Sequence, residues 1–172
     1  DDYVSAAGHS FVEGTCTVCG EADPDYVAPV TLTAKGFSLS FEDEILVNLY
    51  YTVSDMTNVV EQGMLVVYNE GKYTIENADD IYIGSTYDPV KNRYMSTTDG
   101  IAAKEMGESQ FVVGYVRLND GSYKYSAVVE YSPRIYAANM VNKASSSAET
   151  KKLCNALMAY GAAAQKYLDY KT

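Results

Sequence analysis

Apolar and polar residues alternate along the chain from Val30 to about Tyr131, and a period of two is typical of half-buried β-strands. The alternation is strictest at 37–41, where apolar residues occupy positions 37, 39 and 41. Other segments are longer apolar runs rich in β-branched residues and tyrosine, which favour strands. The predicted strands cover 30–34, 37–41, 45–53, 64–68, 81–83, 93–95, 111–118 and 123–131.

Turn signals separate these runs. Asn119-Asp120-Gly121 lies between the last two, and Asp-Gly supplies the positive φ of a tight hairpin turn. No helical period intervenes between the strands, so the pattern predicts an antiparallel β-sandwich rather than alternating strands and helices.

The apolar period changes to three or four residues after Ser132-Pro133, and proline is well tolerated in the first turn of a helix. Ile135, Ala138 and Val141 or Asn142 predict a short amphipathic helix that ends near Lys143. A loop follows at 144–147. A second helix is predicted from Ala148 or Glu149, with apolar positions at Leu153, Leu157, Tyr160, Ala164 and Tyr167 or Leu168.

The first 29 residues lack both periods. They hold two of the three cysteines and the single histidine, and the segment 21–29, rich in acid and proline, is typical of a linker. We therefore predict three parts: a CxxC knuckle with its linker at 1–29, a β-sandwich at 30–132, and a helical pair packed on the sandwich at 133–172.

Composition narrows the function classes. The chain has 172 residues, of which 47% are hydrophobic, which excludes a disordered chain. The formal net charge of −10 disfavours a nucleic-acid partner or an anionic membrane surface. No apolar run approaches the ~18 residues of a membrane span, so no membrane insertion is expected. Three cysteines are too few for a disulfide scaffold.

Two resemblances add to this picture. The segment MGESQFVVGYV at 106–116 resembles a strand entry of fibronectin type III and immunoglobulin-like sandwiches, with Phe111 at the position of the tyrosine corner. GHSFVEGTCTVCG at 8–20 resembles a short repeat of secreted and cell-surface proteins of gut Firmicutes. LSFEDEILVNLYYTV, DGSYKYSAVVEYSPRIYAANM and LMAYGAAAQKYLDYKT are similar to the sandwich-plus-helices module that follows that repeat.

The resemblance to Firmicutes proteins implies a location as well as a fold. It implies an extracellular or cell-surface protein of a Gram-positive gut bacterium, secreted with its signal peptide removed. It also implies a multidomain parent, so other domains of the parent chain are expected partners.

His9, Cys16 and Cys19 are the sharpest chemical feature. Cys-x-x-Cys-Gly is typical of a metal knuckle, and a histidine adds a third ligand suited to Zn²⁺. The resemblance implies a further cysteine shortly before the histidine, which is absent here; Asp1, Asp2, Asp23 or a neighbouring molecule could supply an oxygen, and Ser5 is a poor substitute. A Cys16–Cys19 disulfide, or free thiols without metal, is the alternative, and an open catalytic zinc is another.

Catalytic patterns are sparse. A single histidine leaves no independent base for a hydrolytic triad, and Cys154 is interpreted as a small buried hydrophobe of the last helix. Glu42-Asp43-Glu44 and Asp79-Asp80 are adjacent acids, which we interpret as solvated turns. A hydrolase that uses these acids is an alternative, and a Ca²⁺ site formed from Asp79, Asp80, Asp88 or Asp99 is another.

The 17 tyrosines, without any tryptophan, allow two interpretations. Tyrosine is a good strand former at the edge of a core. Alternatively, exposed rings in the irregular 70–98 region form a platform that stacks sugar rings of a polysaccharide or a host or cell-surface glycan. The candidate ligand-binding residues are Tyr73, Tyr82, Tyr87 and Tyr94.

The sequence therefore predicts a mainly β protein: an immunoglobulin- or fibronectin III-like antiparallel sandwich with two C-terminal helices and a small N-terminal knuckle. The expected function is a non-catalytic accessory, adhesion or spacer module of a larger extracellular protein, with structural zinc as the only candidate cofactor. A carbohydrate-binding module is the first alternative.

Overall fold

A computed structural model describes residues 8–41 and 44–170. The chain divides into two compact units, 1–30 and 31–172. The C-terminal helices belong to the same unit as the sandwich, because they pack against its strands and loops.

The first unit is built on a two-residue hairpin. β1 (Phe11–Val12) pairs with β2 (Thr15–Cys16), and Thr15 forms an isolated bridge with Ala22. The turn between the strands holds Glu13 at φ 48° and Gly14 at φ 78°, and two successive positive φ angles are what a two-residue hairpin turn of the primed type requires.

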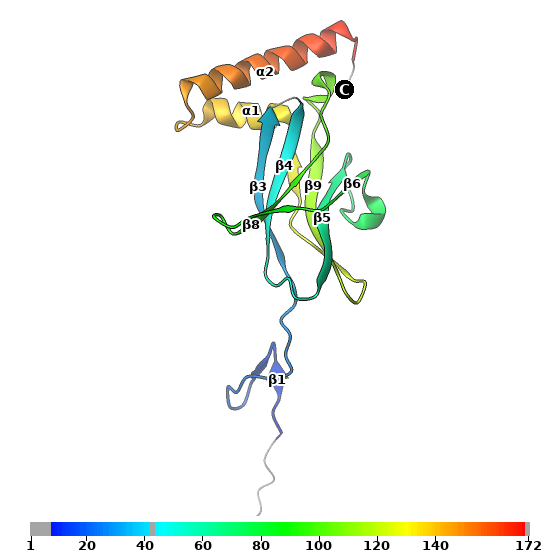
Figure 1. The fold of residues 1–172 in the computed structure, drawn as a ribbon, viewed down its shortest axis with the longest axis vertical. Helices are drawn as coiled ribbons and strands as arrows, with labels where there is room; N and C mark the ends of the chain where they lie inside the picture. Colours follow the sequence, from blue (N-terminus) through cyan, green and yellow to red (C-terminus); the bar gives the residue numbers. More distant parts are fainter. Residues whose placement is uncertain (1–7, 42–43, 171–172) are drawn as a thin grey trace, which may run out of the picture. The chain divides into compact units, whose positions relative to one another are not determined.

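The second unit contains two antiparallel sheets (Figure 1). In one sheet the strand order is β3-β4-β8-β7, and in the other it is β10-β9-β5-β6, with β11 also paired to β9. The strands of the first sheet are β3 (Leu32–Phe41), β4 (Ile45–Val53), β8 (Arg93–Thr97) and β7 (Thr86–Asp88). Those of the second are β10 (Tyr123–Tyr125), β9 (Gln110–Leu118), β5 (Val59–Val67), β6 (Asp80–Ile83) and β11 (Val129–Tyr131). Two short 3₁₀ turns, η1 (Ile75–Asn77) and η2 (Ala103–Glu105), lie between strands.

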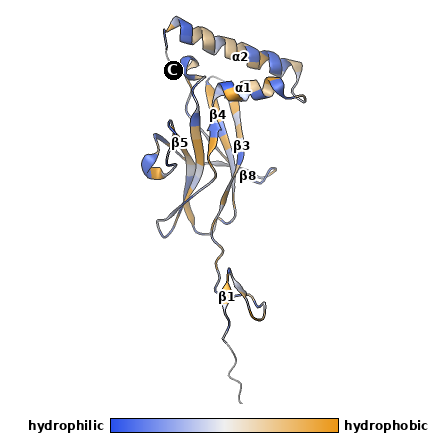
Figure 2. Cartoon of the chain, turned by 180° about the vertical axis from the view of Figure 1, so that it is seen from behind, coloured by the Kyte–Doolittle hydropathy of each residue, from blue (hydrophilic) through white to orange (hydrophobic). Residues whose placement is uncertain are grey.

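The core lies between β4 of one sheet and β9 of the other. Tyr51 of β4 is fully buried, and a Cβ added at Gly114 of β9 would come within 3.0 Å of its ring. Glycine at 114 therefore leaves the space that the large tyrosine ring occupies between the sheets. The remaining core consists of aliphatic residues from both sheets, including Val47, Leu49, Met64, Leu65, Val112 and Val116. In Figure 2 the hydrophobic colour runs along β5 and parts of β4, whereas α2 is mixed.

The hairpin predicted at 119–121 is confirmed: β9 ends at Leu118, β10 begins at Tyr123, and Gly121 has φ 84°. Several strand boundaries differ from the prediction: β5 begins at Val59 rather than at 64, and β7 was not predicted. The runs 30–34 and 37–41 form the single strand β3, because the register shift between Ala34 and Phe37 absorbs Gly36 at φ 92°.

The single run predicted at 123–131 splits into β10 and β11. Ser126 interrupts it: its hydroxyl accepts a hydrogen bond from Gly114 N at 3.0 Å and donates one to Ala127 O at 2.9 Å. Both strands still pair with β9. The interruption therefore changes the local path of the chain, but both segments stay in the same sheet.

The helices follow the prediction closely. α1 (Pro133–Asn142) begins after Ser132, whose hydroxyl accepts a hydrogen bond from Ile135 N, and α2 (Ala148–Tyr167) begins after Ser147, which caps Thr150 N in the same way. Both lie at one end of the sandwich (Figure 1). None of the helices within the described residues has the length and apolar character needed to cross a bilayer.

The protein is thus mainly β, with antiparallel sheets and two C-terminal helices, and its fold is consistent with a β-sandwich. Phe111 lies near the start of β9, and its ring packs on Tyr73 with centroids 5.5 Å apart. Membership of the immunoglobulin or fibronectin III group remains a proposal.

Candidate functional site

The knuckle, residues 9–22, brings its cysteines together through backbone hydrogen bonds. Gly20 N donates to Cys16 O at 2.9 Å, and Cys16 N donates to Glu21 O at 2.7 Å. Gly20 has φ 76°, a conformation that side chains other than glycine rarely adopt, so the glycine after Cys19 allows the chain to fold back onto β2.

His9, Cys16 and Cys19 have ligand atoms that all lie within 4.8 Å of one another. His9 Nδ1 is 3.4 Å from Cys19 Sγ, close to the ~3.5 Å edge that the Zn–N and Zn–S bond lengths give for a tetrahedral site. The structure thus brings together the three predicted residues, and the donor set of one imidazole and two thiols fits a zinc ion.

Cys16 is buried and lies nearest the backbone of the turn. Hydrogen bonds from the backbone of Cys19 and Val18, and a weaker one from the His9 side chain, lower the pKa of the Cys16 thiol to about 6, against the opposing effect of burial. A thiol with a lowered pKa is largely thiolate at neutral pH, and the thiolate is the form that binds metal.

Glu21 is a neighbour of the cluster that the sequence did not single out. Its Oε2 atom is 3.4 Å from His9 Nε2 and 4.0 Å from Cys19 Sγ. With Nδ1 directed to Cys19, Nε2 is free to donate a proton to this carboxylate, an arrangement that orients a metal-binding imidazole. A carboxylate that follows Cys-x-x-Cys-Gly directly is the signal that could have identified it.

Of the oxygen donors predicted as a fourth metal ligand, only Asp23 lies within the described residues. Asp23 Oδ1 accepts a hydrogen bond from Asp25 N at 3.0 Å, so it stabilises the turn after the knuckle. Asp1, Asp2 and Ser5 lie outside the described residues. Both knuckle cysteines are free thiols in the structure.

The four candidate tyrosines are distributed over both sheets. Tyr87 and Tyr94 are partners on β7 and β8, with ring centroids 5.1 Å apart, and Tyr94 also stacks on the buried Tyr51. Tyr73 packs on Phe111 of the other sheet. Tyr82 of β6 lines a separate polar pocket, so the structure brings together only Tyr87 and Tyr94 as a pair.

The polar pocket has a volume of about 220 Å³ and is lined by tyrosine rings, carboxylates and the ends of several strands. Its lining includes Tyr68, Tyr82 and Tyr131 together with Asp80 and Asp99. Burial is the main factor that raises the pKa of both Tyr82 and Tyr131, so both phenols are protonated at neutral pH. The Tyr131 hydroxyl already donates to Gln110 Oε1 and the Tyr68 hydroxyl to Asp80, so among the tyrosines of the lining the Tyr82 hydroxyl is the donor without an acceptor in the described residues. Tyr68 and Tyr131 were not predicted here because only the folded sheet brings them to Asp80.

The acidic pairs have structural partners. Asp79 Oδ2 accepts a hydrogen bond from Tyr68 N at 2.7 Å, and Asp80 accepts one from the Tyr68 hydroxyl. The pair thus fixes a single tyrosine at the end of β5. Glu44 contacts Gly100, while Glu42 and Asp43 lie outside the described residues.

Asp88 is also occupied locally. Its Oδ1 atom accepts hydrogen bonds from Val90 N and Lys91 N, and Oδ2 pairs with Arg93 at 3.7 Å. Within the part of the chain that the structure describes, His9, Cys16 and Cys19 are the one group of His, Cys, Asp or Glu residues close enough to share a metal ion.

Cys154 is buried in α2, and burial raises the pKa of its thiol. This is the environment of an inert packing residue.

Neither a protein-family model nor a curated protein sequence matches the chain.

Proposed function

We propose that the chain is a non-catalytic accessory module of a larger extracellular protein. We also propose that zinc bound by His9, Cys16 and Cys19 stabilises the fold of its N-terminal unit. The convergence of the three donor atoms within 4.8 Å carries the zinc proposal. Extracellular location and the accessory role rest on the resemblance to surface proteins of gut Firmicutes.

A structural metal suits this unit because its own apolar burial is small. Phe11 and Val12 of β1 and Val18 of the turn are exposed, whereas Cys16 is buried. Zinc would crosslink the segment before β1, the end of β2 and the following turn, and such sites contribute directly to folding. His9 would bind through Nδ1, Cys16 and Cys19 through sulfur, and Glu21 would hold His9 Nε2.

Metal analysis of the purified chain tests this proposal. We expect about one zinc per chain in the wild type and a large loss in Cys16→Ser. Cys154→Ala is the matched control, because it removes a buried thiol that is remote from the cluster in sequence, and it should retain the metal. A wild type that stays metal-free after refolding with excess zinc contradicts the proposal.

Carbohydrate binding is the second candidate function, and the polar pocket favours it. Phenol hydroxyls and carboxylates that converge around a small cavity are groups that hydrogen-bond sugar hydroxyls, and the Tyr82 ring adds an apolar surface. A glycan array and affinity gels with starch, mucin and plant glycans test it. Binding that is lost in Tyr82→Ala and kept in Tyr87→Ala supports this function, whereas no ligand across the panels favours the accessory role.

A further inference from the structure

A second cavity lies where the C-terminal helices meet the loop before β9. Its lining is mainly apolar, whereas that of the polar pocket is mainly polar. Its volume is about 330 Å³, within the range of ~300–1,000 Å³ typical of small-molecule sites. Three segments line it: 106–107 after η2, 133–134 at the start of α1, and one face of α2. The lining residues are Met106, Gly107, Pro133, Arg134, Met158, Gly161, Ala162 and Gln165.

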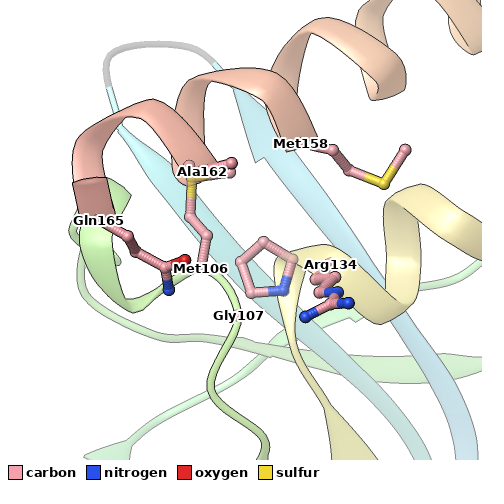
Figure 3. Close-up of a pocket in the computed structure, with 8 residues that line it drawn as sticks. Met106, Gly107, Arg134, Met158, Ala162 and Gln165 are labelled. Atoms are coloured by element: carbon pink, nitrogen blue, oxygen red, sulfur yellow. The ribbon is translucent and has the colours of Figure 1, made fainter. Parts of the chain in front are cut away.

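The walls of this cavity are apolar and adjustable. Figure 3 shows Met106 extending towards Ala162 of α2, while Met158 projects from α2 near α1. Unbranched methionine side chains change shape easily and adapt to ligands of different outline. Gly161 lies opposite Met106, because a Cβ there would be in van der Waals contact, at 3.4 Å, with both Ala103 O and the Met106 Cβ.

Arg134 is the only charged residue of the lining. The chain has a formal net charge of −10, yet none of the eight lining residues carries a carboxylate. The other two arginines have carboxylate partners: Arg93 lies 3.7 Å from Asp88, and Arg117 lies 3.2 Å from Glu61. Arg134 is exposed at the mouth of the cavity, and among the described residues it forms no ion pair.

The other nitrogen donors beside the cavity each already have a partner. Arg134 N donates to Met106 O at 3.0 Å, Ile135 N donates to the Ser132 hydroxyl, and Gln165 Nε2 donates to Lys104 O at 2.9 Å. The backbone amides at the start of α1 therefore have partners, which leaves the Arg134 guanidinium as the group that can bind an anion.

We propose that this cavity binds a small organic monocarboxylate, with the apolar body between Met106 and Met158 and the carboxylate paired with Arg134. An apolar enclosure selects the body, and a guanidinium without a protein partner selects the charge. The site is distinct from the knuckle and from the polar pocket, so it stands independently of the proposed function.

Methionine-methyl NMR on the full chain tests this proposal, with hexanoate as the probe. The chain has six methionines, of which Met106 and Met158 line the cavity. We expect hexanoate to shift these two methyl resonances saturably and to leave the Met56 and Met95 signals unchanged. 1-Hexanol should bind about tenfold more weakly or worse, because it lacks the charge-assisted pair.

Two variants separate the contribution of the Arg134 charge to binding from that of the apolar cavity. Arg134→Gln should weaken hexanoate binding about tenfold and leave 1-hexanol binding unchanged, whereas Lys143→Gln removes an exposed cation at the other end of α1 and should change neither. Ala162→Leu, on the exposed side of the cavity, should abolish binding of both probes. Absence of a saturable shift, or equal binding of hexanoate by Arg134→Gln and the wild type, overturns the proposal.

Discussion

The knuckle and the sandwich are held together in different ways. In the sandwich, Leu49, Tyr51 and Val112 are fully buried between two sheets. In the knuckle each strand has two residues, and Val12 and Val18 are 58% and 74% exposed. A unit of about 30 residues cannot bury enough apolar surface to fold without a metal, a disulfide or a partner. The zinc proposed at His9, Cys16 and Cys19 would stabilise the smaller unit in place of the large apolar core that stabilises the other.

The largest expected effect separates the two units. Chelation of metal, or the substitution Cys16→Ser, should unfold residues 8–30 and leave the thermal midpoint of the sandwich unchanged, because the units have separate sources of stability. Amide NMR dispersion measures the first and calorimetry the second. A knuckle that keeps its dispersed signals in excess chelator would show that metal does not hold it.

Tyr51→Ala should have the converse effect, with a loss of about 3–5 kcal/mol of sandwich stability through the cavity left against Gly114. Metal content should stay at the wild-type value. Tyr51→Phe is the matched control: it removes only the hydrogen bond to Ser85, 2.5 Å away, and should cost about 1 kcal/mol. Chemical denaturation gives both values, and equal losses in the two variants would contradict the packing argument.

Alkaline pH should weaken the sandwich. Burial raises the pKa of Tyr51 and Tyr131 above that of a free phenol, so the folded state retains these protons at pH values where the unfolded state loses them. Their contribution is complete below about pH 10 and falls above it, by up to about 1.4 kcal/mol per pH unit for each tyrosine. Denaturation at a series of pH values measures this slope, which Tyr131→Phe should reduce; an unchanged slope contradicts the assignment.

The smallest effect concerns the helix caps. Ser132→Ala removes the acceptor for Ile135 N and should cost about 1 kcal/mol. Ser147→Ala removes a similar bond at an exposed helix start, so we expect a loss of at most that size. Denaturation midpoints compare the two. Because Ser132 is buried and Ser147 is exposed, a loss at Ser147 that exceeds the one at Ser132 would contradict this ranking.

The fold was predictable where local patterns act alone. Asp120-Gly121 defines one hairpin, and Ser132-Pro133 defines the start of α1, because each combines a backbone preference with a clear change of period. The bulge at Gly36 and the interruption at Ser126 were not predicted. Both depend on partners from another strand, for example the bond from Gly114 N to the Ser126 hydroxyl.

The candidate sites also differ in how much of each could be predicted from the sequence. His9, Cys16 and Cys19 lie within eleven residues of sequence, so a single hairpin and turn bring them together, and the sequence already specified them as one cluster. Glu21, by contrast, has its place beside His9 only because the turn at Gly20 directs it there.

Sequence by itself determined the strand and helix periods, the hairpin turn at 119–121 and the grouping of His9, Cys16 and Cys19, because these depend on residues close together in the chain. Tertiary structure alone decided that Tyr82 and Tyr131 meet Asp80, and that Arg134 meets Met106 and Met158. Such cavities form between elements far apart in sequence, and their lining depends on sheet order and helix packing rather than on any local pattern.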